Sequence, residues 1–360
     1  MAGYWKYHMN HCFRIFLLVI AGLAGLAVQA PVRAADSAVV IMYHRFGETT
    51  YPSTNIRLEQ FDAHLEELAK PEYTVLPVPE IVERIRNGAD LPDRTVGLSV
   101  DDAYISVYTE AWPRLKAAGI PFTLFVATQS VDRGVGGYMS WDQIRELKAA
   151  GVTIGSQTHS HLHMPTSSPE RNAEELRLSN ERFRAELGEV PTVIAYPYGE
   201  YSLAVRKVAQ EAGFTIGFGQ HSGVVFPGID TMYLPRFAMN ENFGGISRFR
   251  LAANALPLRI KDITPADPLL SASNNPPILG FTVTGDAVNS LNRLACYASG
   301  QGKARLERLG PRVEVRLDDM DAAVVDGRDD LGIGVVADNA EATAGDEGRR
   351  RQPDIAEAGH

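Results

Sequence analysis

Short apolar runs alternate with amphipathic stretches from residue 38 to about residue 220. The apolar runs have the length of strands and are bounded by turn residues; they cover residues 38–43, 95–100, 122–127, 152–155, 193–196 and 214–218. Between them, apolar residues recur at helical spacing; these stretches cover residues 58–68, 81–85, 104–118, 141–150, 170–187 and 202–212. Alternating strands and helices are typical of a parallel sheet with flanking helices. We therefore expect a barrel-like α/β fold.

The pattern changes beyond about residue 255. Two Pro-rich and Asn-rich segments, 264–268 and 274–277, are typical of linkers. Residues 279–283 and 312–316 have the composition of strands, so residues 256–317 are expected to form a linker and a small β-rich appendage. From about residue 318 the chain is rich in Asp, Ala, Gly and Arg and has no aromatic residue, which predicts a disordered tail over residues 318–360.

The N-terminus has the pattern of an export signal. Lys6 and Arg14 precede the apolar run 15–28, and small residues surround Ala34 and Ala35. This arrangement predicts a signal peptide over residues 1–35 and a periplasmic, cell-surface or secreted protein. The run of 14 residues is shorter than the roughly 20 of a membrane span, although an uncleaved anchor is the alternative. No later segment has that length, so no stable span is expected after cleavage.

Charge and cysteine content argue against a nucleic-acid-binding protein and against a fold held by disulfides. The formal net charge is −9, and much of the excess acid lies in residues 318–360. The sequence has no basic stripe suited to nucleic-acid phosphates, so nucleic acid is not an expected partner. Cys12 would leave with the signal, and Cys296 would then be the one remaining cysteine, so no disulfide framework is expected.

Polar residues follow the ends of four predicted strands. They are His44, Asp101 with Asp102, His159 with His163, and Tyr198. In a barrel-like α/β fold, the loops after the carboxyl ends of the strands gather on one face, where the active site lies. The four strand ends therefore predict one shared site.

The residue types at this site predict a metal centre. One Asp and two His at i, i+4 can form a three-ligand site with an open position, and a second Asp is left over to act as a base. Asp101 and Asp102 taken alone are more often a solvated turn or a helix N-cap. His161 lies between His159 and His163 at another phase, so we expect it to support the ligands or face solvent.

Three motifs together resemble those of the polysaccharide deacetylases, the NodB-homology or carbohydrate esterase 4 group. The family's Thr-Phe-Asp-Asp motif is similar to Ser99-Val100-Asp101-Asp102, and its His-Ser/Thr-x-x-His motif is similar to residues 159–163. Its Arg-x-Pro-Tyr-Gly motif is similar to Ala195-Tyr196-Pro197-Tyr198-Gly199. The motifs occur in the family's order. The resemblance implies a distorted (β/α) barrel of the NodB-homology type over residues 36–255.

The resemblance also implies roles for individual residues. Asp102, His159 and His163 would hold a divalent metal, usually Zn²⁺, and Asp101 would be the general base. Tyr198, preceded by Pro197, would help hold the oxyanion through its backbone N–H. A bound metal would lower the pKa of water to about 7 and polarise the amide carbonyl.

This sequence departs from the family pattern in two places, and each departure indicates a further candidate site residue. Ala195 stands where many members have an arginine that orients the base, and Arg236 is a candidate for that role. The usual late histidine motif is absent, while Met42-Tyr43-His44-Arg45 resembles the start of the exported poly-N-acetylglucosamine deacetylase subgroup. This likeness gives His44 the role of general acid, with a structural histidine at a strand end as the alternative.

The sequence thus predicts an exported, metal-dependent enzyme that hydrolyses N-acetyl groups of an N-acetylhexosamine polysaccharide. A non-catalytic carbohydrate-binding protein on the same scaffold is one alternative, and the spare Asp101 argues against it. A hydrolase that acts on an O-acetyl ester or a small amide is another, because the chemistry is shared.

Overall fold

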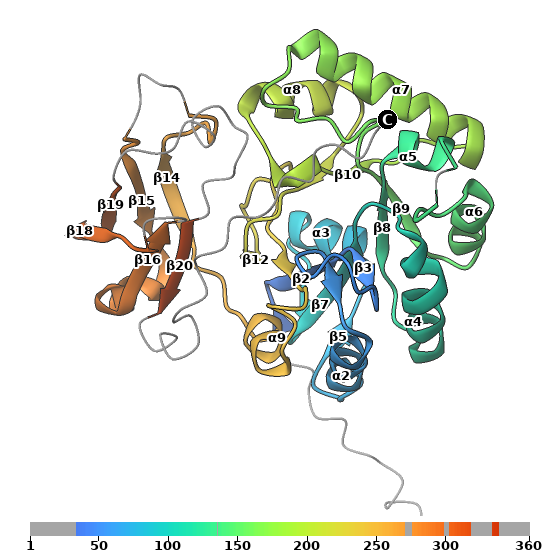
Figure 1. Cartoon of the computed structure of the whole chain (residues 1–360). Coiled ribbons are helices and arrows are strands. Elements are labelled where there is room, and N and C mark those ends of the chain that lie inside the picture. The colour runs from blue at the N-terminus through green and yellow to red at the C-terminus, as the bar shows by residue number, and fades with distance from the viewer. Residues whose placement is uncertain (1–33, 135, 271–275, 299–301, 318–332, 338–360) are drawn as a thin grey trace, which may run out of the picture. The chain divides into compact units, whose positions relative to one another are not determined.

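The computed structural model describes residues 34–134, 136–270, 276–298, 302–317 and 333–337. A curled, open sheet with helices around its outer side forms the larger part of this structure (Figure 1). Its main strands lie in the order β11, β10, β9, β8, β7, β2, β12. Their bounds are β2 Ala38–Tyr43, β7 Thr95–Val100, β8 Thr123–Val126, β9 Thr153–Ser156, β10 Val193–Ala195, β11 Ile216–Phe218 and β12 Val224–Val225.

Neighbouring strands from β11 to β2 are parallel, whereas β12 is antiparallel to β2. Two short strands, β5 Thr74–Val75 and β13 Phe237–Ala238, pair with β7 and β2. The other short strands are β1 Ala34–Ala35, β3 Arg45–Phe46, β4 Asn55–Ile56 and β6 Leu91–Pro92. This curled parallel sheet confirms the predicted α/β barrel-like fold, although the sheet does not close.

Six helices follow the predicted segments, whereas α5 and α9 were not predicted. Their bounds are α2 Leu58–Leu68, α3 Val78–Arg86, α4 Trp112–Ala118, α5 Thr128–Asp132, α6 Trp141–Ala149, α7 Pro169–Leu187, α8 Leu203–Glu211 and α9 Ile246–Ala253, with a 3₁₀ turn at Pro197–Gly199. The predicted helix over residues 104–118 is interrupted by a π-helical turn at Val107–Ala111. Pro113 has no N–H to donate to the preceding turn, so a wider turn occupies that place.

The strands are buried because helices cover them. All residues of β2, β7 and β8 are buried, as expected for central strands of a parallel sheet. The predicted apolar run 122–127 thus lies in the core. Because these strands are fixed on both faces, the residues that follow their carboxyl ends start from well-defined positions.

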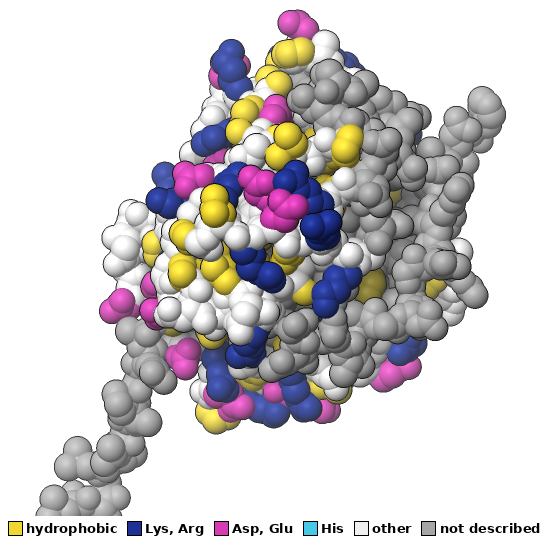
Figure 2. Space-filling model, turned by 90° about the vertical axis from the view of Figure 1, so that its left-hand side faces the viewer, with side chains coloured by type: hydrophobic (Ala, Val, Ile, Leu, Met, Phe, Trp, Pro, Cys, Tyr) yellow, Lys and Arg dark blue, Asp and Glu magenta, His cyan; other side chains and the backbone are white. Residues whose placement is uncertain are grey.

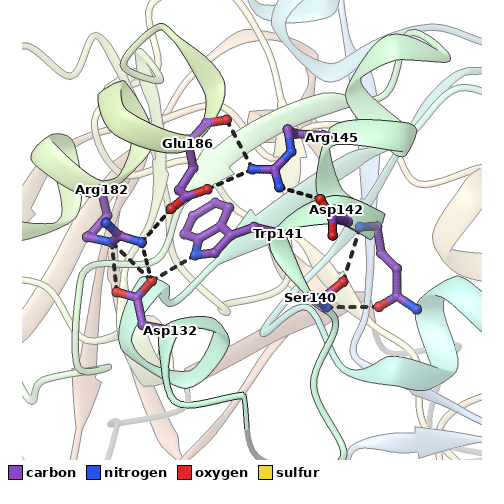
Figure 3. A network of polar contacts seen from close by, with 8 residues as sticks. Asp132, Ser140, Trp141, Asp142, Arg145, Arg182 and Glu186 are labelled. Atoms are coloured by element: carbon purple, nitrogen blue, oxygen red, sulfur yellow. Dashed lines mark hydrogen bonds and ion pairs between the residues drawn. The ribbon is translucent and has the colours of Figure 1, made fainter.

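An ionic network on the surface joins α5, α6 and α7 (Figure 3). Asp132 accepts hydrogen bonds from the Trp141 indole at 2.7 Å and from Arg182. Glu186 accepts from Arg182 at 2.6 Å and from Arg145 at 2.7 Å. Exposed pairs of this kind contribute about 0–1 kcal/mol each. The network links α7 to α5 and α6.

Residues 260–337 contain antiparallel strands. One sheet has the order β14, β15, β19, β18, and a second has the order β17, β16, β20. Their bounds are β14 Ile260–Thr264, β15 Leu279–Val283, β16 Leu294–Ala298, β17 Gly302–Lys303, β18 Arg305–Leu309, β19 Arg312–Arg316 and β20 Ile333–Ala337, with a 3₁₀ segment at Gly285–Arg293. The predicted strands 279–283 and 312–316 are confirmed. Cys296 is buried as a free thiol.

Three predictions concern segments largely outside the described residues. They are the signal peptide, most of the second linker and most of the tail over residues 318–360. Within the predicted tail, residues 333–337 form β20, which pairs with β16. The sequence pattern did not predict β20.

Among the described residues, no helix has the length and apolar character needed to cross a membrane. On the face in Figure 2, basic and acidic side chains are interspersed.

Candidate functional site

The predicted site residues follow the carboxyl ends of parallel strands. His44 follows β2, Asp101 and Asp102 follow β7, the segment 157–163 follows β9, and Pro197 opens the turn after β10. We call residues 157–163 the histidine loop. Because these strands run in the same direction, their carboxyl ends share one edge of the sheet.

Asp101 is held by two hydrogen bonds from one arginine. Arg236 donates from its two terminal nitrogens to Oδ1 at 2.6 Å and to Oδ2 at 2.8 Å. Both side chains are fully buried. Arg236 also donates from Nε to the Gly219 carbonyl at 2.9 Å and from Nη1 to the Ser99 hydroxyl at 3.2 Å. A bidentate pair of this kind fixes the plane and orientation of the carboxylate.

His44 lies close to the same carboxylate. Its Nε2 is 3.9 Å from Oδ2 of Asp101. The Asp101 backbone N–H donates to the Tyr43 carbonyl at 2.9 Å, which joins the ends of β2 and β7. The structure therefore brings together His44, Asp101 and Arg236, three of the residues singled out in the sequence.

Asp102 adopts a left-handed conformation with φ of 73°. Its backbone N–H donates to Oε1 of Gln157 at 2.9 Å. Its Oδ1 atom is buried, has no hydrogen-bond partner among the described residues, and lies 3.3 Å from Nε2 of His161. Burial raises the pKa of Asp102, but attraction to His161 outweighs it and lowers that pKa below its ordinary value. Conversely, burial lowers the pKa of His161, and Asp102 raises it above its ordinary value.

The two histidines predicted as metal ligands contact other residues. His159 Nδ1 lies 2.8 Å from the Thr128 hydroxyl, in a hydrogen bond. His163 donates from Nδ1 to the carboxylate of Glu200, at 2.9 and 3.0 Å. Its ring stacks on Tyr198, with centroids 3.9 Å apart and planes 2° apart. Burial, and then the proximity of His161, lowers the pKa of His163.

Tyr198 forms the centre of the turn after β10. It has φ of 60°, and Pro197 and Gly199 on either side are buried. Its ring contacts His161 edge-on, with centroids 4.5 Å apart. Burial, and then Asp102, raises the pKa of the Tyr198 hydroxyl. The Pro-Tyr-Gly turn thus lies against the histidine loop, on the side of His161 and His163.

The predicted ligands were tested for their fit to a metal. Among the described residues, no group of three His, Cys, Asp or Glu side chains is placed to hold a metal ion. Asp102 and His161 converge, which supplies two donors, whereas a catalytic zinc site has three protein ligands. As placed, Asp102, His159 and His163 do not complete such a site.

Sequence reasoning missed Gln157 and Glu200 as members of the site, and it expected His161 to support the ligands or face solvent. Glu200 directly follows the Pro-Tyr-Gly turn, but nothing in its sequence context indicates the contact with His163. That contact depends on how the turn packs against the histidine loop.

Part of this chain is similar in sequence to known proteins. Residues 88–217 match the family model described as polysaccharide deacetylase. YxkH of Bacillus subtilis (strain 168) is 26% identical over 184 residues, which cover 51% of this chain and 64% of YxkH, just under two thirds of that relative. The poly-beta-1,6-N-acetyl-D-glucosamine N-deacetylase of Staphylococcus aureus (strain MSSA476) is 25% identical over 235 residues, covering 58% of this chain and 80% of that protein.

Solved structures show the same fold. The Streptococcus pyogenes deacetylase PplD, determined in complex with acetate, has a TM-score of 0.57 and 21% identity, covering 61% of this chain and 99% of PplD. IcaB from Ammonifex degensii has a TM-score of 0.52 and 26% identity, covering 61% of this chain and 98% of IcaB. The curled sheet and the residues at its edge define a deacetylase-type α/β domain. Over this domain the chain is similar in sequence and in fold to polysaccharide deacetylases, which are hydrolases.

Proposed function

We propose that this protein is an exported polysaccharide N-deacetylase that releases acetate from an N-acetylhexosamine polymer. The observation that carries the proposal is the fully buried, bidentate pair of Asp101 and Arg236 at the sheet edge, with His44 3.9 Å away. A carboxylate fixed in this way beside an imidazole is suited to acid–base catalysis. The likeness to the Staphylococcus aureus poly-N-acetylglucosamine deacetylase supports the choice of substrate class.

In the proposed reaction, Asp101 takes a proton from a water molecule that attacks the acetamide carbonyl carbon. Arg236 keeps the carboxylate in the orientation that this transfer requires. His44 then gives a proton to the amine nitrogen as the carbon–nitrogen bond breaks, and acetate is released. The backbone N–H of Tyr198, after Pro197, is proposed to stabilise the oxyanion of the tetrahedral intermediate.

A divalent cation, Zn²⁺ in the first instance, is part of the proposal. Asp102 and His161 are the two donors that converge, and Oδ1 of Asp102 has no hydrogen-bond partner among the described side chains. The ligand set Asp102, His159 and His163 stays a prediction. The contacts of His159 with Thr128 and of His163 with Glu200 use Nδ1, and a metal-ligating histidine commonly donates its second ring N–H to such a partner.

Acetate release tests the proposal directly. The mature protein is incubated with β-1,6-linked N-acetylglucosamine oligomers, with added Zn²⁺ or with a chelator, beside Asp101→Asn. Loss of a positioned general base reduces the rate about 100-fold or more. Asp93→Asn, at an exposed loop position, is the matched control and should keep the parent's rate.

Other outcomes separate the alternatives. Equal rates for the parent and Asp101→Asn would exclude Asp101 as the base. Acetate released only from O-acetylated glycans would assign the site to ester hydrolysis. Retention of the oligomers without any acetate release would favour the carbohydrate-binding alternative.

A further inference from the structure

The backbone of the histidine loop is strained. Thr158 has φ of 67° and His161 has φ of 61°, in the left-handed region that side chains rarely adopt. Such residues cost on the order of 1–3 kcal/mol each and persist only where the surrounding structure holds them. Thr158 is β-branched, which makes this conformation less favourable still. The loop therefore requires contacts that keep it in place.

Helix α7 supplies these contacts through a polar stripe on its inner face. The stripe consists of Asn172, Glu175 and Ser179, which follow helical spacing and are all buried. Asn172 donates to the Met164 carbonyl at 2.8 Å, just after the loop. Ser179 shares a hydrogen bond of 3.1 Å with Ser156, just before the loop.

Glu175 contacts the middle of the loop. Its Oε1 atom accepts a hydrogen bond from the backbone N–H of Ser160. Ser160 lies between His159 and His161, so this bond holds the His159–Ser160 peptide, one residue before His161. The direction of the His161 side chain depends on the loop backbone that follows this peptide, and His161 Nε2 faces Asp102 at 3.3 Å.

A buried carboxylate at this position lowers the stability of the folded protein, so stability alone does not account for it. Glu175 is fully buried, and its Oε2 atom makes no hydrogen bond among the described residues. Glu175 also has a charged neighbour, Arg171, whose guanidinium lies 3.3 Å from Oε2. Burial of a charge with few partners destabilises the folded state, and an apolar residue would fill the same place on the helix.

We propose that Glu175 is a positioning residue: it holds the Ser160 N–H so that His161 is directed at Asp102. The consequence for catalysis rests on the proposed function, whereas the effect on the loop does not. The ionic network links α7, the helix that carries Glu175, to α5 and α6 (Figure 3).

Two substitutions at Glu175 distinguish the role of its hydrogen-bond acceptor from the role of its charge. Glu175→Leu removes the acceptor, whereas Glu175→Gln keeps an oxygen that can accept from Ser160. Phe183→Leu is the matched control, because Phe183 is a fully buried residue of α7 that packs on Trp141. Hydrogen exchange of the Ser160 amide is measured first, together with the imidazole resonances of His161.

The expected result is that Glu175→Leu loses the protection of the Ser160 amide and shifts the His161 resonances. Glu175→Gln and Phe183→Leu should keep both. In acetate release, kcat of Glu175→Leu should fall about 100-fold with little change in KM, as for a misplacement of a catalytic site by about 1 Å. If Glu175→Leu does not fold, Glu175→Asp takes its place, with a shorter side chain and the same charge.

Unchanged Ser160 protection in Glu175→Leu, or loss of protection in Phe183→Leu to the same extent, would overturn the proposal. A parent protein without acetate release would count against the proposed function. The exchange comparison would then still decide the positioning role, because it requires no substrate.

Discussion

Arg236 and Asp101 are 135 residues apart in the sequence and form a bidentate ion pair in which both side chains are fully buried. Each charge is compensated almost entirely by the other. Removal of one partner therefore leaves an uncompensated charge in the interior, which is more unfavourable than removal of both.

Arg236→Met should lower the free energy of unfolding by about 3–5 kcal/mol, because Asp101 loses its buried counter-charge. The double variant Asp101→Asn/Arg236→Met should recover part of that loss. Urea unfolding of the parent, the two single variants and the double variant measures the coupling. Arg84→Met, which removes an exposed pair with Glu80, is the control and should cost no more than about 1 kcal/mol. Strictly additive losses would show that the buried pair is not coupled.

Gln157→His should strengthen binding of a divalent metal. Gln157 is fully buried and its side chain reaches the Asp102 backbone at 2.9 Å, so an imidazole there would lie beside the converging Asp102 and His161. A third ligand should raise the affinity for Zn²⁺ or Co²⁺ at least about tenfold, or about 1.4 kcal/mol.

Calorimetry with Zn²⁺ and the visible spectrum with Co²⁺ measure this change in metal affinity. Gln210→His, on the exposed side of α8, provides a control for non-specific binding by an added histidine. Equal gains in the two variants would show that Gln157 does not adjoin the proposed cation site.

The stability of the protein should fall as the pH decreases from about 6.5 to about 4. His64 is fully buried, and burial, aided by Arg248, lowers its pKa from 6.5 to about 4 in spite of the hydrogen bond to Gly244. In that range the unfolded chain binds the proton and the folded protein does not, so acid favours unfolding. The contribution is on the order of 3 kcal/mol.

His64→Phe tests this source of pH dependence. The aromatic ring still packs on Phe249, but no group at this position titrates. The variant is expected to be less stable at pH 7, since Tyr43 and Gly244 lose a partner, yet its stability should decline less between pH 6.5 and 4. Phe249→Leu keeps His64 and should keep the parent's slope. A parent-like slope in His64→Phe would rule out His64 as its cause.

Gly199→Ala should destabilise the protein and reduce acetate release. Gly199 has φ of 79°, and an added Cβ would lie 2.7 Å from the backbone nitrogen of Gln220. The turn that carries Tyr198 and Glu200 would have to move. Gly188→Ala is a matched control, since Gly188 has φ of 77° but open space around the added atom. Gly188→Ala should lower the free energy of unfolding by only about 1 kcal/mol, the cost of the left-handed backbone conformation. Equal effects of the two substitutions on unfolding and kcat would show that close packing at Gly199 is unimportant.

The sequence by itself determined the local elements and the edge of the sheet at which the candidate residues lie. Strands β2 and β7 begin and end at the predicted residues, because a run of apolar residues bounded by polar ones is a local signal. The carboxyl ends of parallel strands share one edge, so His44 and Asp101 could be placed on one face before their contacts were known.

Only the tertiary structure decided which side chains meet. The i, i+4 spacing led us to pair His159 with His163, but the histidine loop is not a helix, and left-handed residues at Thr158 and His161 rotate the side chains away from helical phase. His161 therefore faces Asp102, while His163 turns to Glu200. The contact of Arg236 with Asp101 likewise depends on packing between segments distant in sequence. Side-chain direction in a loop follows from backbone angles and packing, which residue spacing does not specify.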